Sequence, residues 1–211
     1  MTQNQTDGET RQRLSAREVR DQIIEQVRVD VITGVLPESM SLREQALASK
    51  YGVSRAPVRD ALLELTREGV LVAKPNHGVK VSRPSSPELQ KVVVGMRRKI
   101  EVFALKKAFE SRDRSWVDRV EATLERLRTP CEENATADIV RCDLALHRSI
   151  VEAPEIEGLV SIWVPVTTRM FMRYSRLSGG DAIFREHAAI VDAIRDQDFE
   201  AAKNALVANV R

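Results

Sequence analysis

The chain of 211 residues carries ionisable side chains at positions where a helix usually presents apolar ones to a core. Asp143 and His147 are one helical turn apart, and they interrupt an apolar stripe that includes Ile139 and Ile150. Polar groups on an inward face cost free energy unless they find partners. A carboxylate and an imidazole that point the same way either pair inside the core or share a metal ion. The spacing alone leaves both interpretations open.

Two more polar residues interrupt apolar faces closer to the C-terminal end. His187 lies on a stripe with Ile183, Ile190 and Ile194, and Asn209 lies on the apolar face of the last expected helix. A single histidine on such a stripe is more often part of a hydrogen-bonded core than a ligand, because buried polar groups usually pair internally. Taken by itself, this pattern favours internal pairing.

A second set of residues has the chemistry to bind nucleic acid. Arg55 and Arg59 are one turn apart on an exposed helix face that follows a turn at Gly52. Ser54 is the expected N-cap, whose hydroxyl would accept from a free N–H, and Pro57 falls early enough in the helix to be tolerated. Guanidinium groups bind phosphate oxygens or guanine O6 and N7. Surface arginines are common, so the pair alone favours solvation, whereas its helix–turn–helix setting favours DNA.

The net charge of +2 says little, but its distribution along the chain is uneven. Residues 40–83 contain eight Lys and Arg against four Asp and Glu, whereas residues 84–211 contain twenty of each. A basic segment that coincides with a helix–turn–helix pattern indicates contact with phosphates. The excess is modest and would be weak evidence without the pattern.

The elements expected before residue 88 form a winged helix–turn–helix. They are a helix from Ser15 to Gly34, a loop over 37–41, a short helix over 42–50, a helix from Ser54 to Gly69, and strands over 70–73 and 79–81. A hairpin directly after a helix–turn–helix is a wing, so residues 15–83 are the expected DNA-binding domain. Residues 1–14 are polar and aperiodic and are expected to be disordered. Residues 84–87 are the expected linker.

The remainder of the chain, residues 88–211, is expected to be an all-α bundle, which makes the fold class mostly α. The predicted helices cover 88–110, 115–128, 136–152, 156–177, 181–196 and 198–210. Breaks are expected at Asp113, Pro130, Pro154, Gly179-Gly180 and Gln197-Asp198. Pro165 is expected to kink the fourth of these helices.

Composition excludes several classes of protein. No stretch approaches 18 consecutive apolar residues, so no membrane-spanning helix is expected. The first residues lack an apolar signal region, so export is not expected. Cys131 and Cys142 are too few for a disulfide framework, and a reduced cytoplasmic setting with two ordinary thiols is the simple interpretation.

Several motifs resemble a known family. The head resembles the winged helix of the GntR transcription regulators through the segments 42–48 (LREQALA), 52–62 (GVSRAPVRDAL) and 75–78 (PNHG). The helical remainder is similar to the FCD ligand-binding domain of the FadR-type subfamily. The matching pieces there are Arg97-x3-Glu101, Asp143-x3-His147 and the segment 186–194 (EHAAIVDAI).

The resemblance implies a set of DNA contacts on the head. One family position before the turn, often arginine, is Gln45 here, which brings no charge. Glycine at position 78 is also explained by turn geometry alone. The residues implied are Gln45, Ser54, Arg55, Ala56 and Arg59, with the wing turn at His77 and Gly78 entering the minor groove.

The resemblance also implies a metal site, because many FCD domains hold a divalent ion with one Asp and three His. Asp143, His147 and His187 match three of these positions, and Asn209 stands at the fourth. An amide oxygen is a weaker ligand for zinc or nickel but suits harder ions such as manganese. The site is therefore either a metal site of altered affinity or a metal-free ligand pocket.

The implied effector is a small carboxylate, bound near any metal by residues that include Arg97, Glu101 and Asn209. Arg97 would form forked hydrogen bonds to an acid group, or would simply pair with Glu101 on the helix surface. Arg173 and Tyr174 would face the same cavity, or else the outside or a dimer contact.

The expected protein is a homodimeric transcription regulator, most often a repressor in this family, that binds an inverted-repeat operator in double-stranded DNA. It is not expected to be an enzyme. Two alternatives are a metal-dependent enzyme with a DNA-binding head and a sensor of fatty acyl thioesters. The latter branch has dispensed with the metal, so the retained Asp143, His147 and His187 argue against it.

Overall fold

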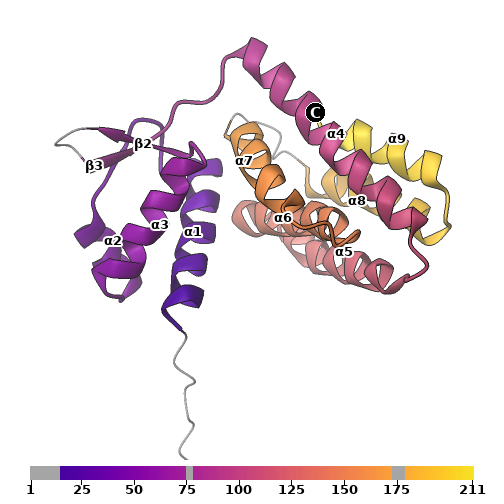
Figure 1. The fold of residues 1–211 in the computed structure, drawn as a ribbon, viewed down its shortest axis with the longest axis horizontal. Coiled ribbons are helices and arrows are strands. Elements are labelled where there is room, and N and C mark those ends of the chain that lie inside the picture. The colour runs from indigo at the N-terminus through magenta and orange to yellow at the C-terminus, as the bar shows by residue number, and fades with distance from the viewer. Residues whose placement is uncertain (1–14, 75–77, 173–178) are drawn as a thin grey trace, which may run out of the picture.

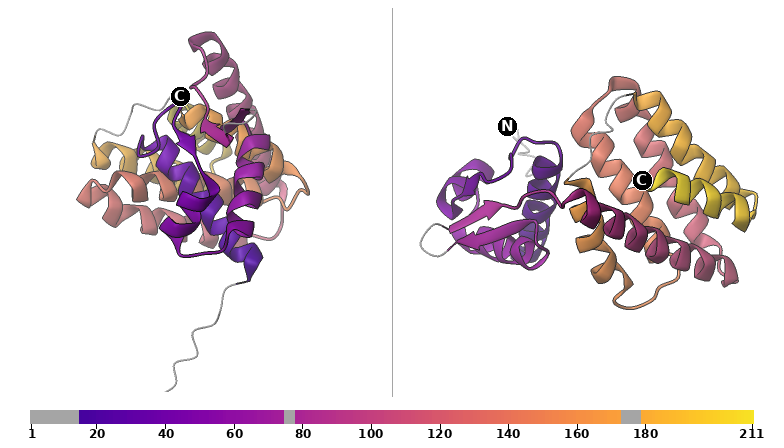
Figure 2. Two further views of the ribbon diagram at one scale, coloured as in Figure 1. Left: turned by 90° about the vertical axis from the view of Figure 1, so that its left-hand side faces the viewer. Right: turned by 90° about the horizontal axis from the view of Figure 1, so that it is seen from above.

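The computed structural model describes residues 15–74, 78–172 and 179–211 of the chain (Figure 1). The expectations for residues 1–14, His77, Arg173 and Tyr174 concern positions outside the described residues. The described part confirms a mostly helical fold with a small antiparallel sheet (Figures 1 and 2). The head and the helical bundle lie side by side, and one long connection joins the hairpin of the head to the first helix of the bundle.

The head contains three helices and three strands. They are α1 (Ala16–Ile32), β1 (Ser41–Leu42), α2 (Glu44–Tyr51), α3 (Arg55–Arg67), β2 (Leu71–Lys74) and β3 (Gly78–Val81). A capping box starts α1, in which the Ser15 hydroxyl accepts from the Glu18 N–H at 3.2 Å and the Glu18 carboxylate accepts from the Ser15 N–H at 2.7 Å.

The turn between α2 and α3 positions the exposed arginines. Gly52 ends α2 with φ at +65°, a left-handed conformation that glycine adopts without strain. Ser54 precedes α3 as its N-cap residue, but its hydroxyl makes no capping hydrogen bond in the described structure. The expected side-chain cap was therefore wrong, although the helix begins where it was predicted.

The sheet has the order β1–β3–β2, and both pairings are antiparallel. Leu42 of β1 is opposite Val79, and Leu71 of β2 is opposite Val81. The sequence predicted a loop up to residue 41 and no strand there. A two-residue strand has no periodic signal of its own, and pairing with β3, far along the chain, creates it.

The bundle consists of six helices within the described residues. They are α4 (Pro87–Glu110), α5 (Ser115–Glu133), α6 (Thr136–Glu152), α7 (Leu159–Phe171), α8 (Gly180–Arg195) and α9 (Phe199–Asn209). None of the helices in the described ranges is both long and apolar enough to cross a bilayer.

Pro130 does not break a helix, contrary to expectation. The α5 helix continues through Pro130 to Glu133, and Asn134 follows as its C-cap residue with φ at +52°. Proline cannot donate to the carbonyl of Arg126, four residues earlier. The Cys142 thiol of α6 donates to that carbonyl instead, at 3.4 Å, so a neighbouring helix compensates for the lost hydrogen bond.

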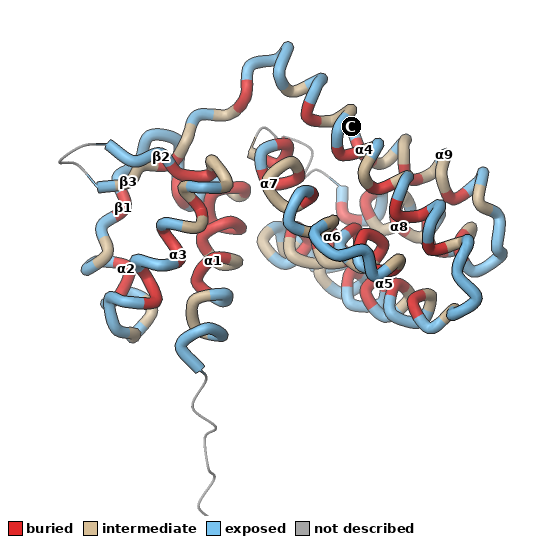
Figure 3. The backbone as a smooth tube through the Cα atoms, viewed as in Figure 1, coloured by how far each residue is buried: buried red, intermediate tan, exposed pale blue. Residues whose placement is uncertain are grey.

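The first helix packs on both parts of the molecule, and most of its second half is buried (Figure 3). Ile23 and Val27 belong to the core of the head, together with Leu62 and Leu65 of α3. Val29, on another face of α1, belongs to a core cluster that is otherwise formed mainly by the bundle. The side chains of Gln26 and Arg141 also form a hydrogen bond of 2.8 Å between α1 and α6. Any movement of the head against the bundle must therefore break contacts made by α1.

Gly180 marks a close approach of α8 to α5. A Cβ atom at this position would overlap the Cys131 carbonyl oxygen and lie 2.7 Å from its carbonyl carbon. We expect Gly180→Ala to lower the free energy of unfolding by about 1–3 kcal/mol, because backbone atoms must shift. A Cβ atom added at Gly95 of α4 would meet nothing within 4 Å. Gly95→Ala should therefore raise the free energy of unfolding by about 0.5–1 kcal/mol. Urea unfolding of both variants checks this pair, and equal effects would contradict the packing described.

Candidate metal centre and nucleic-acid interface

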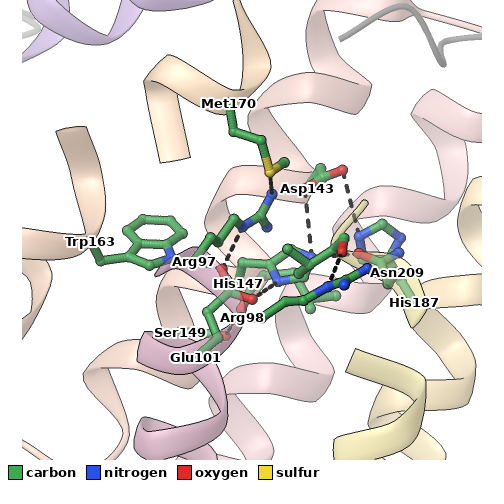
Figure 4. A network of polar contacts seen from close by, with 12 residues as sticks. Arg97, Arg98, Glu101, Asp143, His147, Ser149, Trp163, Met170, His187 and Asn209 are labelled. Carbon is green, nitrogen blue, oxygen red and sulfur yellow. Dashed lines mark hydrogen bonds and ion pairs between the residues drawn. The ribbon is translucent and has the colours of Figure 1, made fainter. Parts of the chain in front are cut away.

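The bundle encloses a cluster of polar side chains contributed by five helices (Figure 4). Glu101 and His147 are 0% exposed and Arg97 is 1% exposed. The cluster consists of Arg97 and Glu101 from α4, Asp143 and His147 from α6, Trp163 and Met170 from α7, His187 from α8 and Asn209 from α9. The structure thus brings together all six candidate ligand and metal residues named from the sequence.

Glu101 lies at the centre of the hydrogen bonds in this cluster. Its Oε1 accepts from Arg97 Nε at 2.6 Å and from Trp163 Nε1 at 2.7 Å, and its Oε2 lies 2.8 Å from His147 Nδ1. Burial alone would raise the pKa of Glu101, but the charges of Arg97 and His147 outweigh burial and lower it to about 2. The Arg97–Glu101 ion pair is therefore a buried one, not a surface pair.

Fixed hydrogen-bond partners orient both histidines. The ionised Glu101 carboxylate accepts from His147 Nδ1, and the Ile183 carbonyl accepts from His187 Nδ1 at 2.7 Å. In a neutral imidazole the other nitrogen then carries the lone pair, as in His187, whereas His147 Nε2 also lies at hydrogen-bond distance, 3.0 Å, from the Asn209 amide oxygen. Both Nε2 atoms lie 3.7 Å from an oxygen of Asp143. Partners of this kind on the far nitrogen are typical of histidines that bind metals.

Asp143 and the two histidines do not complete a hydrogen-bonded core. At 3.7 Å their nitrogen and oxygen atoms are too far apart for hydrogen bonds. Asp143 Oδ1 and His187 Nε2 are buried and have no hydrogen-bond partner in the part of the chain that is described. Each of Asp143, His147 and His187 offers one potential metal-ligand atom, and these three atoms lie within 4.8 Å of one another. This arrangement has the residue types and the spacing of a divalent metal site.

The charges around Asp143 keep it ionised. Burial alone would raise the pKa of Asp143, but the proximity and charge of His187, followed by the charges of His147 and Arg97, lower it to about 2. Burial would lower the pKa of His187, and Asp143 outweighs that effect and raises it. The site therefore offers an anionic carboxylate, which is the form that binds a cation.

Asn209 reaches the cluster because the end of α9 is held in place. Its Oδ1 lies 3.0 Å from His147 Nε2, and its Nδ2 donates to Glu186 Oε2 at 3.4 Å. Arg98 Nε donates to the Val210 carbonyl at 2.7 Å, and Arg211 pairs with Glu186. The amide oxygen is thus close to the same space as the Asp143 and histidine atoms.

Sequence reasoning missed two members of the cluster, Trp163 and Met170. Trp163 donates to Glu101, and Met170 Sδ accepts from Arg97 Nη1 at 3.7 Å. Both residues belong to an apolar helix, where the sequence pattern indicates only core packing. No local signal distinguishes them, because their roles depend on partners from α4.

The second candidate site is a hollow on the head, between α2, the start of α3 and the wing. Gln45, Ser54, Arg55, Ala56, Arg59 and Gly78 are all exposed. The hollow has a volume of about 610 Å³, and four of these residues line it, namely Gln45, Arg55, Arg59 and Gly78. Arg43 and Lys80 also line it and were not named from the sequence, although the basic bias of residues 40–83 includes them. Arg55 is partly neutralised by Glu44, at 3.1 Å.

Glu101 provides a test of the buried network. Glu101→Gln keeps the shape but leaves the buried Arg97 charge unpaired, so we expect the free energy of unfolding to fall by about 3–5 kcal/mol. Glu152→Gln breaks an ion pair with Arg148 in which both side chains are about half exposed, and should cost about 0–1 kcal/mol. Chemical denaturation measures both. A Glu101 variant as stable as the Glu152 variant would contradict the central role of Glu101.

Two family models match this chain, and they cover most of it. The model described as "Bacterial regulatory proteins, gntR family" matches residues 19–81, and the model described as "FCD domain" matches residues 93–211. The resemblance drawn from the sequence motifs is therefore confirmed.

Similar proteins are transcription regulators. The chain is 28% identical over 205 residues to the "Probable D-xylose utilization operon transcriptional repressor" of Paenarthrobacter nicotinovorans, with 95% of this chain and 89% of that protein covered. It is 21% identical to the "HTH-type transcriptional repressor RspR" of Escherichia coli K12, with 92% and 86% covered. The solved structure of E. coli McbR/YncC superposes with a TM-score of 0.76 at 18% identity and covers 94% of each chain. These relatives are regulators and not enzymes, so the enzyme alternative was wrong. The chain belongs to the gntR family of bacterial regulatory proteins and carries an FCD domain.

Proposed function

We propose that this protein is a homodimeric repressor that binds an inverted-repeat operator and responds to a small carboxylate bound near a divalent metal ion. The observation that carries the sensing part is the pair of buried, unpartnered atoms Asp143 Oδ1 and His187 Nε2. The names of the relatives support repression. Since the target is chromosomal DNA of a bacterium, the proposal places the protein in the cytoplasm.

The head binds DNA through the hollow between α3 and the wing. The start of α3 enters the major groove, where Arg55 and Arg59 reach phosphates or guanine edges. Gly78, the first residue of β3, lines the same hollow. Exchange of the Arg55–Glu44 pair for a phosphate costs little, because the Arg55 side chain is 69% exposed.

A second copy of the chain covers an apolar stripe on α4. Leu89, Val92, Met96 and Phe103 are exposed apolar residues, and their spacings of three, four and seven residues put them on one face of the helix. Burial of this face in a dimer removes it from water and sets two α3 helices about 34–36 Å apart, one turn of DNA. The molar mass in solution should be twice the 23.7 kDa of the chain, and a monomer would contradict this part of the proposal.

The donor set of the cluster suits zinc, nickel or manganese. Asp143, His147 and His187 would supply three ligands, and Asn209 Oδ1 a fourth, weaker one. A bound divalent ion would supply a Lewis acid that attracts a carboxylate of the effector. Arg97 Nη2 is buried without a partner in the described structure and remains available to donate to such a carboxylate. A sensor of acyl thioesters has no use for this donor set, which favours the small carboxylate.

Arg59 tests the DNA-binding face. Arg59→Ala should weaken binding to an operator selected in vitro from random DNA by about 5- to 150-fold, the equivalent of about 1–3 kcal/mol for a lost bidentate contact. Arg67→Ala, at the far end of the same helix, should bind as the wild type does, because Arg67 is exposed and pairs with Glu64. Fluorescence anisotropy with labelled operator measures both. Equal affinities of the two variants would contradict the assignment of α3.

Asn209 tests the metal site. The protein freed of metal with a chelator should bind about one zinc ion per chain, and Asp143→Ala should lose it. Asn209→His should raise zinc affinity about tenfold or more, because imidazole is a better zinc ligand than an amide oxygen. The control Asn204→His adds a histidine to the exposed face of the same helix and should leave the zinc affinity unchanged. Calorimetric titration checks these outcomes, and zinc binding that ignores Asp143 and Asn209 would refute the site.

A further inference from the structure

The small sheet of the head presents an outward face beside the start of α3. Residues along an extended strand point alternately to the two faces of a sheet. In β3, Val79 and Val81 pack in the core of the head, and Lys80 between them lines the hollow. Val72, the partner of Lys80 on β2, is 45% exposed, as a residue on the outward face should be. The Lys80 side chain therefore lies on the face turned away from the core.

Arg43 extends this outward face past the end of β1. Ser41 is the partner of Lys80 on β1 and is exposed, whereas Leu42 is buried in the core of the head. Arg43 still has an extended backbone, with φ at −109° and ψ at 129°, so the alternation continues and Arg43 lies on the side of Ser41. Its side chain is exposed, lines the hollow and makes no capping hydrogen bond to α2. The side chain of Arg43 is thus free to contact a partner.

The hollow carries an excess of positive charge. Among its lining residues are four cations, and Glu44 is the one acid. Glu44 pairs with Arg55, which leaves Arg43, Arg59 and Lys80. The side chains of these three make no ion pair or hydrogen bond within the described part of the chain. Unpaired cations gathered at one hollow favour a polyanion as its partner.

The width of the DNA groove determines which part of the duplex each cation meets. A helix with its side chains is about 10–12 Å across, and the major groove is about 12 Å wide. The start of α3 therefore fills the groove when it enters. Arg43 and Lys80 lie beside α3 on the outward face of the sheet, so they meet the sugar–phosphate strand that borders the groove and not the base edges inside it.

We infer that Arg43 and Lys80 bind phosphates of the DNA backbone and thereby set the position of α3 in the groove. The inference rests on the proposed function, because it takes the start of α3 to be the part that enters DNA. Contacts to phosphates fix the register and orientation of a protein on the duplex. Gln45 lines the same hollow without a charge, so the start of α2 contributes its positive charge through Arg43.

The salt dependence of DNA binding counts these contacts. Each phosphate contact releases condensed counterions, so the logarithm of the binding constant falls against the logarithm of the salt concentration with a slope of about −0.9 per contact. Arg43→Ala and Lys80→Ala should each make the slope shallower by about 0.9 per bound head, roughly 1.8 for a dimer on its operator. Fluorescence anisotropy with the operator selected in vitro measures the slope between about 50 and 200 mM salt.

Two further readouts separate a phosphate contact from other roles of Arg43. Arg43→Ala should weaken binding to the operator and to a scrambled duplex by the same factor, because phosphates carry no sequence information. Arg43→Lys should keep the wild-type slope, because a phosphate contact requires the charge and not the planar fork of the guanidinium group. Unchanged thermal unfolding shows that each variant is folded.

Arg112→Ala is the matched control, which loses the same charge far from the head. Arg112 is exposed and follows the end of α4 that lies away from the head (Figure 1). Its variant should keep the wild-type slope.

Three outcomes would overturn the inference. They are an unchanged slope in Arg43→Ala and Lys80→Ala, an equal change of slope in Arg112→Ala, and a loss of affinity confined to the operator. Failure of the proposed function gives a different result, namely that no selected duplex binds the wild-type chain or that Arg59→Ala binds as tightly as the wild type.

Discussion

The buried carboxylate of Glu101 is the interaction on which the rest of the bundle depends. It accepts hydrogen bonds from Arg97 and Trp163 and lies against His147, so one charge ties α4, α6 and α7 together. A buried ion without its partners is costly, and loss of any one partner leaves the others uncompensated. The same carboxylate fixes Nδ1 of His147 as the donor and turns Nε2 toward Asp143. Stability and site chemistry therefore share one group.

The buried network is connected to the proposed DNA-binding face by packed helices. Trp163 links Glu101 to α7, and α7 contacts α1. The α1 helix in turn packs against α3, which carries Arg59. A ligand that changes the position of α7 would act on α1 directly. The free energy by which it changes operator affinity would be limited by the difference in its own affinity for the DNA-bound and the free arrangement of head and bundle. The route is short because α1 packs in both core regions.

The sequence predicted the features that have local signals. The turn at Gly52, the apolar stripes that carry His147 and His187, and the wing follow from periodicity and turn chemistry. The misses come from interactions between distant segments. Pro130 continues a helix because Cys142 of the next helix replaces a hydrogen bond, and β1 exists because β3 pairs with it. The role of Trp163 likewise required its partner from α4.

Anomalous diffraction at the zinc edge, from crystals of the full chain grown with zinc, tests most directly whether the cluster is a ligand site. The expected result is one anomalous peak, about 2.0–2.2 Å from an oxygen of Asp143 and from Nε2 of His147 and His187. The contradicting result is a map without a peak there, in which His187 donates directly to Asp143 and the three residues close into a hydrogen-bonded core.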